Sequence, residues 1–195
     1  MWAADRCGQL ARDERGAALL EFTLVAWFFF IAVFGIIEFS LYFWQLGAIS
    51  KGEQAALRYA VVSNPVTGDW ATLQPNSGVV ITCRSQGPGA ASCSPAAHPS
   101  DATAMDCIVN RVRAFAPFVD PENVVVEYRA NTLGLSGLQA PTIQIRLENL
   151  QFISTFLGFM DGQLLPELNN TMTAEDTSSS APGTSATTTV CGLSS

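Results

Sequence analysis

Residues 17–49 read AALLEFTLVAWFFFIAVFGIIEFSLYFWQLGAI, and this stretch decides the architecture of the chain. Only Glu21 and Glu38 are charged in it. A helix needs about 20 apolar residues to cross the hydrocarbon core of a bilayer, so the stretch is long enough to span a membrane with helix to spare. The run from Phe28 to Ile37 is apolar on every side of a helix, which argues against a core helix of a soluble protein.

A cleaved secretory signal is another explanation for an apolar N-terminal stretch. The apolar region of such a signal is usually about 7–15 residues long and ends at a small-x-small cleavage site. The stretch here is longer, contains two glutamates and offers only a poor exit site near Leu46-Gly47-Ala48. We therefore interpret it as a membrane-spanning helix that is retained.

Charge narrows the class of protein and sets the expected orientation. The 195 residues carry a formal net charge of −7, and phosphate contacts need a basic surface, so nucleic-acid binding is not expected. Arg6, Arg12 and Arg15 precede the span, whereas Lys51 and Arg58 are the basic residues that follow it closely. Because Lys and Arg favour the cytoplasmic side, we expect the N-terminus in the cytoplasm and the C-terminal domain outside.

The two glutamates need an explanation, because an unpaired, ionised carboxylate inside a membrane costs several kcal/mol. Glu38 lies about 25 Å beyond Glu21 along a helix, and we expect it near the outer interface, where it reaches water. Glu21 lies one turn inside the apolar stretch, with no Lys or Arg at helical spacing. A cut just before Ala17 would supply it with a cationic partner, because a new N-terminal amine has a pKa of about 8.

The segment Arg15–Phe22 reads RGAALLEF and is followed by the apolar run. It resembles the processing site of type IV pilin-like proteins, in which a prepilin peptidase cuts after a Gly and a Glu is the fifth residue of the mature chain. Over residues 12–66 the sequence resembles the TadE-like family, which are pseudopilins or minor pilins of tight-adherence (Flp-type) pilus systems. Phe22 departs from the Tyr that many tight-adherence pilins have after the Glu.

The resemblance implies which residues act and which partners they meet. Gly16 and Ala17 would form the processing site, and Glu21, Phe22 and Glu38 would act in assembly. In assembled pili of this type, the resemblance implies that the fifth-position Glu neutralises the N-terminal amine of a neighbouring subunit. The implied partners are a prepilin peptidase, other pilin or pseudopilin subunits, the inner-membrane assembly platform of the pilus, and membrane lipid.

Four parts follow from the sequence pattern. They are a cytoplasmic leader (1–16), a transmembrane and extended helix (17–63), a periplasmic α+β domain (64–174) and a Ser/Thr-rich tail (175–195). The helix continues beyond the membrane because polar residues, Glu53 among them, interleave with small and apolar ones at helical spacing up to Val62. Pro65 then ends it. Small residues such as Gly47 and Gly52 would let another backbone approach this part closely.

The outer domain is expected to hold a second helix and a small antiparallel sheet. Asp101 caps the helix, which stops near Pro117. Strands are predicted over 78–84, 124–130, 142–148 and 169–174, a loop over 86–100, and a short helix or buried loop over 152–165. In the third of these strands Ile143, Ile145 and Leu147 alternate with Gln144, Arg146 and Glu148, so that one face is apolar. The predicted fold class is α+β and pilin-like, with the second helix packed on the sheet.

Four cysteines, Cys83, Cys93, Cys107 and Cys191, lie in the region expected outside the membrane, and Cys7 lies in the leader. Outside a bacterial inner membrane the four thiols are expected to pair, with three possible connectivities. If two of Cys83, Cys93 and Cys107 pair with each other, the remaining one is expected to pair with Cys191. The separations of 10, 14 and 84 residues do not suit the closely spaced ligands of a zinc site.

A catalytic constellation is missing from the sequence. His98 is the only histidine, it lies in a Ser/Pro/Ala segment, and no nucleophile motif accompanies it. We therefore expect no enzymatic activity, no cofactor and no metal. The leading hypothesis is a structural pilin-like subunit. The alternative is an unprocessed bitopic membrane protein whose outer domain binds a surface ligand or partner, and the Gly16–Ala17 bond distinguishes the two.

Overall fold

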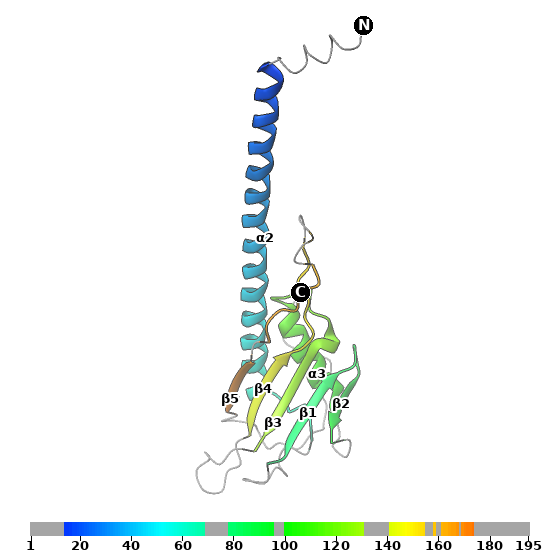
Figure 1. The fold of residues 1–195 in the computed structure, drawn as a ribbon. Coiled ribbons are helices and arrows are strands. Elements are labelled where there is room, and N and C mark those ends of the chain that lie inside the picture. Colours follow the sequence, from blue (N-terminus) through cyan, green and yellow to red (C-terminus); the bar gives the residue numbers. More distant parts are fainter. Residues whose placement is uncertain are drawn as a thin grey trace.

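The computed structural model describes residues 14–68, 78–95, 100–130, 141–154, 158, 161–167 and 169–173. Within these ranges the chain forms a very long helix, a shorter second helix and a five-stranded antiparallel sheet (Figure 1). The predicted α+β class is therefore confirmed. The predictions for Cys7, His98, Cys191 and the tail at 175–195 fall outside the described residues.

Helix α2 extends over Glu14–Val62, which is 49 residues or about 74 Å. It contains no proline, so nothing in its sequence interrupts the backbone hydrogen bonds, and Pro65 follows shortly after its end. The predicted continuous helix is confirmed and begins two residues before Gly16. Its N-terminal half stands clear of the outer domain, and its C-terminal half packs on it (Figure 1).

The sheet has the strand order β2-β1-β3-β4-β5, and every neighbouring pair is antiparallel. The strands are β1 (Val80–Ser85), β2 (Ala91–Ser94), β3 (Val124–Arg129), β4 (Thr142–Leu147) and β5 (Asn169–Thr173). A short 3-10 helix, η2 (Pro121–Asn123), precedes β3. Four of the five strands were predicted from the sequence pattern.

Strand β2 corrects the prediction of an uninterrupted loop over 86–100. Its sequence ASCS lacks the branched and aromatic residues that mark strands, so propensity does not reveal it. The strand forms because a tight turn, with Gly87 and Gly89 at positive φ, folds it back on β1. Its register places Cys93 opposite Cys83.

Helix α3 (Ala102–Arg113) begins where the sequence predicts. The Asp101 carboxylate accepts hydrogen bonds from the backbone N–H groups of Thr103 at 2.9 Å and Ala104 at 3.2 Å, which satisfies donors that a helix N-terminus leaves free. Its buried face includes Met105, Ile108, Val109 and Val112. Helices α2 and α3 pack on each other and on one face of the sheet, with α2 over β4 and β5 and α3 over β1.

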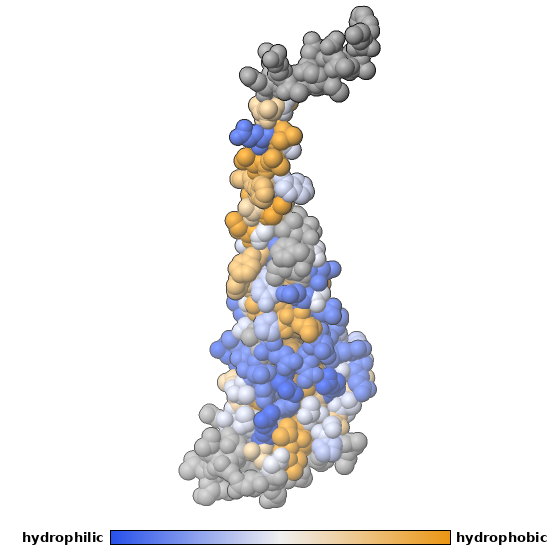
Figure 2. All heavy atoms as spheres, viewed as in Figure 1, coloured by the Kyte–Doolittle hydropathy of each residue, from blue (hydrophilic) through white to orange (hydrophobic). Residues whose placement is uncertain are grey.

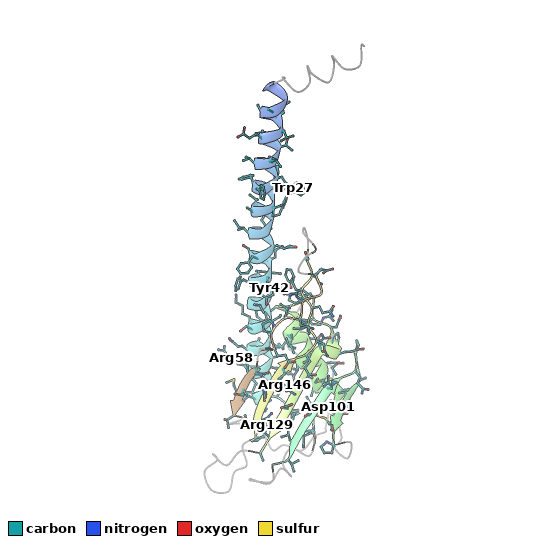
Figure 3. All side chains as sticks on the ribbon, viewed as in Figure 1. Trp27, Tyr42, Arg58, Asp101, Arg129 and Arg146 are labelled. Carbon is teal, nitrogen blue, oxygen red and sulfur yellow. A yellow bond between two sulfur atoms is a disulfide. The ribbon has the colours of Figure 1, made fainter. Side chains whose placement is uncertain are left out.

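The core lies between this helix pair and the sheet. Ile143, Ile145 and Leu147 are buried there, as their alternation predicts. The expected polar face is more enclosed than the pattern suggests, since Gln144 and Glu127 are buried as well. Glu127 forms ion pairs with Arg146 and with Arg129, the latter at 2.9 Å (Figure 3). The two arginines thus cover the Glu127 carboxylate, while the Arg129 side chain itself stays half exposed.

Helices α2 and α3 approach each other closely at Gly52. A Cβ placed on Gly52 would lie 2.9 Å from the backbone oxygen of Val112, which is closer than real Cβ atoms come. At Gly47, one and a half turns earlier, a Cβ would meet no atom within 4 Å. Of the two small residues, Gly52 is therefore the one that allows the close contact, and the contact is with the protein's own outer domain.

We predict that Gly52→Ala destabilises the outer domain by about 1–3 kcal/mol, because the backbones of α2 and α3 must separate to admit the methyl group. Gly47→Ala is the matched control and should be neutral or stabilising by up to about 1 kcal/mol, since alanine favours helix. Thermal unfolding of the full chain in detergent, followed by circular dichroism, measures both. Equal melting temperatures for the two variants would contradict the close helix contact.

Candidate processing and assembly site

The N-terminal half of α2 is apolar on all sides and is not covered by the rest of the described chain. Figure 2 shows a hydrophobic band along this half and a mostly hydrophilic surface over the outer domain. By length and composition the helix is able to cross a membrane. Its exposed side chains include Leu20, Phe22, Leu24, Val25, Trp27, Phe28, Phe29, Ile36 and Ile37.

Gly16 and Ala17 lie in the first turns of α2, with both residues exposed. No atom lies within 4 Å of the position that a Gly16 Cβ would occupy, so the chain itself does not shield this bond. The helix already includes the bond, which differs from the expected helix bounds of 17–63. A protease that binds its substrate extended must therefore unwind this end, where the first four backbone N–H groups lack helical partners.

Glu21 is exposed among the exposed apolar side chains of this half, one turn beyond Ala17. Within the part of the chain that the structure describes, Glu21 forms no ion pair. Phe22 beside it is also exposed. By contrast, the hydroxyl of Thr23 donates to the backbone oxygen of Leu19 at 2.7 Å, so its polar group is satisfied within the helix. Glu21 is the group in this band that calls for an outside partner.

Glu38 does not reach water, and the expectation that it would is wrong. Its side chain is fully buried, and the hydroxyl of Ser154 donates a hydrogen bond to its Oε1. One turn later Tyr42 packs edge-to-face on Phe152, with 5.4 Å between the ring centroids (Figure 3). For segment 152–165 the sequence predicts a short helix or a buried loop. Its described residues contain no helix, and its side chains at Phe152 and Leu165 are buried, so the loop is what forms. This loop encloses Glu38.

Glu53, one of the polar residues in the amphipathic pattern, is a second buried carboxylate on the same face of α2. Asn170 of β5 donates a hydrogen bond to its Oε2 at 2.7 Å. Burial raises the pKa of the Glu53 carboxyl from 4.5 to about 7, and the hydrogen bond from Asn170 opposes this rise. The spacing contained the signal, because Ile49, Ala56 and Ala60 occupy the same helical face and are buried.

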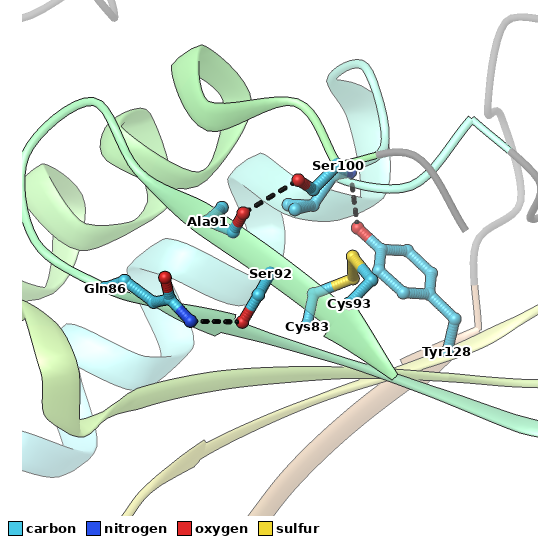
Figure 4. Close-up of a disulfide and its surroundings, with 8 residues drawn as sticks. Cys83, Gln86, Ala91, Ser92, Cys93, Ser100 and Tyr128 are labelled. Atoms are coloured by element: carbon cyan, nitrogen blue, oxygen red, sulfur yellow. Dashed lines mark hydrogen bonds between the residues drawn. A yellow bond between two sulfur atoms is a disulfide. The ribbon is translucent and has the colours of Figure 1, made fainter. Parts of the chain in front are cut away.

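Cys83 and Cys93 form a disulfide across β1 and β2, with their Cα atoms 4.0 Å apart (Figure 4). Beside it, the Tyr128 hydroxyl accepts a hydrogen bond from the backbone N–H of Val66 at 2.9 Å, which ties the segment after α2 to the sheet. Cys107 is disulfide-bonded as well. The pairing of Cys191 stays a prediction. In the described ranges no group of three His, Cys, Asp or Glu side chains is arranged to hold a metal ion.

The predicted site residues fall into two places on one helix. Gly16, Ala17, Glu21 and Phe22 lie together at its exposed end. Glu38 lies about 25 Å farther along α2, inside the contact with the outer domain, so it belongs to a different environment from Glu21. Sequence reasoning missed Ser154 and Asn170, because partners 116 and 117 residues away leave no local pattern.

Comparison with known proteins identifies the helical segment. Residues 16–58 match the family model for TadE-like protein. The resemblance seen in the sequence is thus confirmed for most of α2. TadE-like proteins are pilin-like, structural components associated with Tad pili and the membrane. Neither the curated proteins nor the solved structures include one that matches the chain.

The shifted carboxyl of Glu53 predicts a pH dependence of stability. Between about pH 4.5 and 7 the folded chain keeps a proton on Glu53 that the unfolded chain has released. Stability therefore falls as pH rises through this window and levels off above it. Glu53→Gln removes the titration and keeps an acceptor for Asn170, so this variant should lose less stability between pH 5 and pH 8 and should be the more stable protein at pH 8.

Melting temperatures of the full chain in detergent at pH 5 and pH 8 measure this effect. The exposed carboxylate of Glu122, in η2, provides the matched control, since Glu122→Gln should leave the pH dependence of the wild type unchanged. The same loss of stability in wild type and Glu53→Gln would show that Glu53 is not the titrating group.

Proposed function

We propose that this protein is a pseudopilin or minor pilin of a tight-adherence pilus, matured by a prepilin peptidase that cuts between Gly16 and Ala17. The N-terminus lies in the cytoplasm, α2 crosses the inner membrane once, and the outer domain lies in the periplasm. The chain itself performs no catalysis. It acts by lateral packing of α2 against other pilin or pseudopilin subunits at the assembly platform.

The observation that carries this proposal is the exposed Glu21 in the uncovered apolar half of α2, four residues after an accessible Ala17. In a single subunit this charge has no cationic partner among the described residues, and an unpaired charge inside a bilayer costs free energy. A neighbouring subunit cut before Ala17 would present a cationic amine at the N-terminal end of the same kind of helix. Pairing the two would neutralise both charges and fix how far one subunit is displaced along its neighbour.

We predict that Gly16→Trp blocks maturation. The bulky side chain prevents the close approach of backbone to peptidase that glycine allows. The N-terminus of the protein from membranes of its own host, read by mass spectrometry, should be Ala17 in the wild type and Met1 in the variant. Leu24→Trp, which adds a Trp to the exposed band near Trp27, is the control and should be cut normally.

A wild-type chain that still begins at Met1 would support the unprocessed bitopic protein instead. Normal cutting of Gly16→Trp would contradict the assignment of the processing site to Gly16 and Ala17, but it would not contradict the membrane span.

We predict that Glu21→Leu is cut like the wild type but fails to enter assemblies, because no carboxylate remains to meet the amine. Thr23→Val is the matched control on the same surface and should assemble, since its hydroxyl bonds to Leu19 of its own helix. Both are measured by cross-linking in host membranes followed by blotting for higher species. Assembly of Glu21→Leu at the wild-type level would contradict charge pairing.

A further inference from the structure

Two chain segments between β4 and β5 form a hairpin that lies against α2 at the level of Glu38. We call residues 150–154 and 161–165 the interfacial hairpin. We propose that the interfacial hairpin rests in the outer interface of the bilayer that α2 crosses and that its exposed apolar side chains contact lipid. This inference rests on the membrane span of the proposed function and adds a second contact between the outer domain and the same membrane.

The two arms of the interfacial hairpin are held together by the backbone. Phe152 donates to Gln163 at 2.8 Å, Gly162 donates back to Phe152 at 3.1 Å, and Leu165 donates to Leu150 at 2.8 Å. Gln151 and Leu164 form a β-bridge between them. The described arms therefore have one defined position relative to each other.

Contacts with α2 fix the position of the hairpin along the helix. Ser154 donates to the buried carboxylate of Glu38, and Phe152 packs on Tyr42 one turn farther on. In Figure 1 this segment extends from the sheet along α2 toward its N-terminal half. The end of the hairpin at Ser154 is thus level with Glu38 on the helix axis.

Helix geometry converts this position into a depth. From Ala17 to Glu38 the helix rises about 32 Å, which matches a hydrocarbon core of about 30 Å. If the span begins at Ala17, Glu38 and Ser154 lie at the outer boundary of the core. Tyr42 and Trp44 follow within two turns, and these are the side chains that favour the membrane interface.

The exposed surface of the hairpin suits lipid. Ile153 is 59% exposed and Leu164 is 67% exposed, on opposite arms, although both are large and apolar. Near the level of Glu38, α2 also exposes apolar side chains at Ile36, Ile37 and Phe39. Residues 147–167 contain no Lys or Arg, so attraction to anionic headgroups does not contribute. Burial of apolar area in the interface is the force that would hold it there.

The test places a photoactivatable diazirine amino acid at Ile153 or at Leu164 of the full chain, reconstituted in phosphatidylcholine vesicles. Both side chains are exposed, so the substitutions leave the core unchanged. After irradiation, mass spectrometry detects protein carrying a covalently attached lipid. Val79 is the matched negative control, because it is 41% exposed and lies at the opposite end of the sheet from the hairpin. It precedes β1, whose first residue pairs with Arg129, and Arg129 pairs with Thr142 at the start of β4, whereas the hairpin follows the other end of β4.

Leu24 in the span is the positive control. We expect lipid adducts at Ile153 and Leu164 at several times the yield at Val79, and the same yield when a third of the lipid is replaced by phosphatidylglycerol. Adducts at Leu24 with none above the Val79 level at either hairpin position would overturn the inference and leave the span intact. Cross-links from the hairpin to a second copy of the chain, in place of lipid, would overturn it too. No adduct at Leu24 would overturn both the inference and the span.

Discussion

One unbroken helix has to satisfy two different surroundings, and the rest of the structure depends on how it does so. All internal backbone hydrogen bonds of α2 are made within the helix, so the backbone of its N-terminal half needs no other polar partner and suits a bilayer. Its C-terminal half must instead bury one face in the outer domain. That face is continuous, at a spacing of three to four residues, from Glu38 through Tyr42, Leu46, Ile49 and Glu53 to Ala56.

Two buried carboxylates on this face connect the helix to the segments that follow β4. Glu38 accepts from Ser154, and Glu53 accepts from Asn170, so the segments after β4 are fastened to α2 by polar contacts as well as by packing. Such contacts are specific because a buried carboxylate without a donor is costly. They make the position of the hairpin and of β5 dependent on the correct register of α2.

Much of the fold could be predicted from the sequence because its signals are local. Helix α2 follows from the apolar run and its amphipathic continuation, which Pro65 ends. Helix α3 follows from the Asp101 cap and the helical spacing of its apolar residues, and β4 follows from the alternation of apolar and polar residues. What failed depends on distant pairing. Strand β2 exists only because β1 lies beside it, and the burial of Glu38 and Glu53 follows from Ser154 and Asn170. For the candidate site, the sequence spacing places Gly16, Ala17 and Glu21 close together on one helix, whereas the burial of Glu38 depends on Ser154, 116 residues away.

The two carboxylate contacts also have a mechanical consequence. Glu38 and Glu53 are separated by 15 residues, or about 22 Å along the helix axis, and they lie on one face. A domain fastened at two separated heights on one face of a rod cannot swivel around that rod. Any rotation of α2 about its own axis, as it packs among other helices, therefore turns the sheet through the same angle. In a filament built from such helices, the packing of α2 among the neighbouring helices would therefore set the direction in which the outer domain faces.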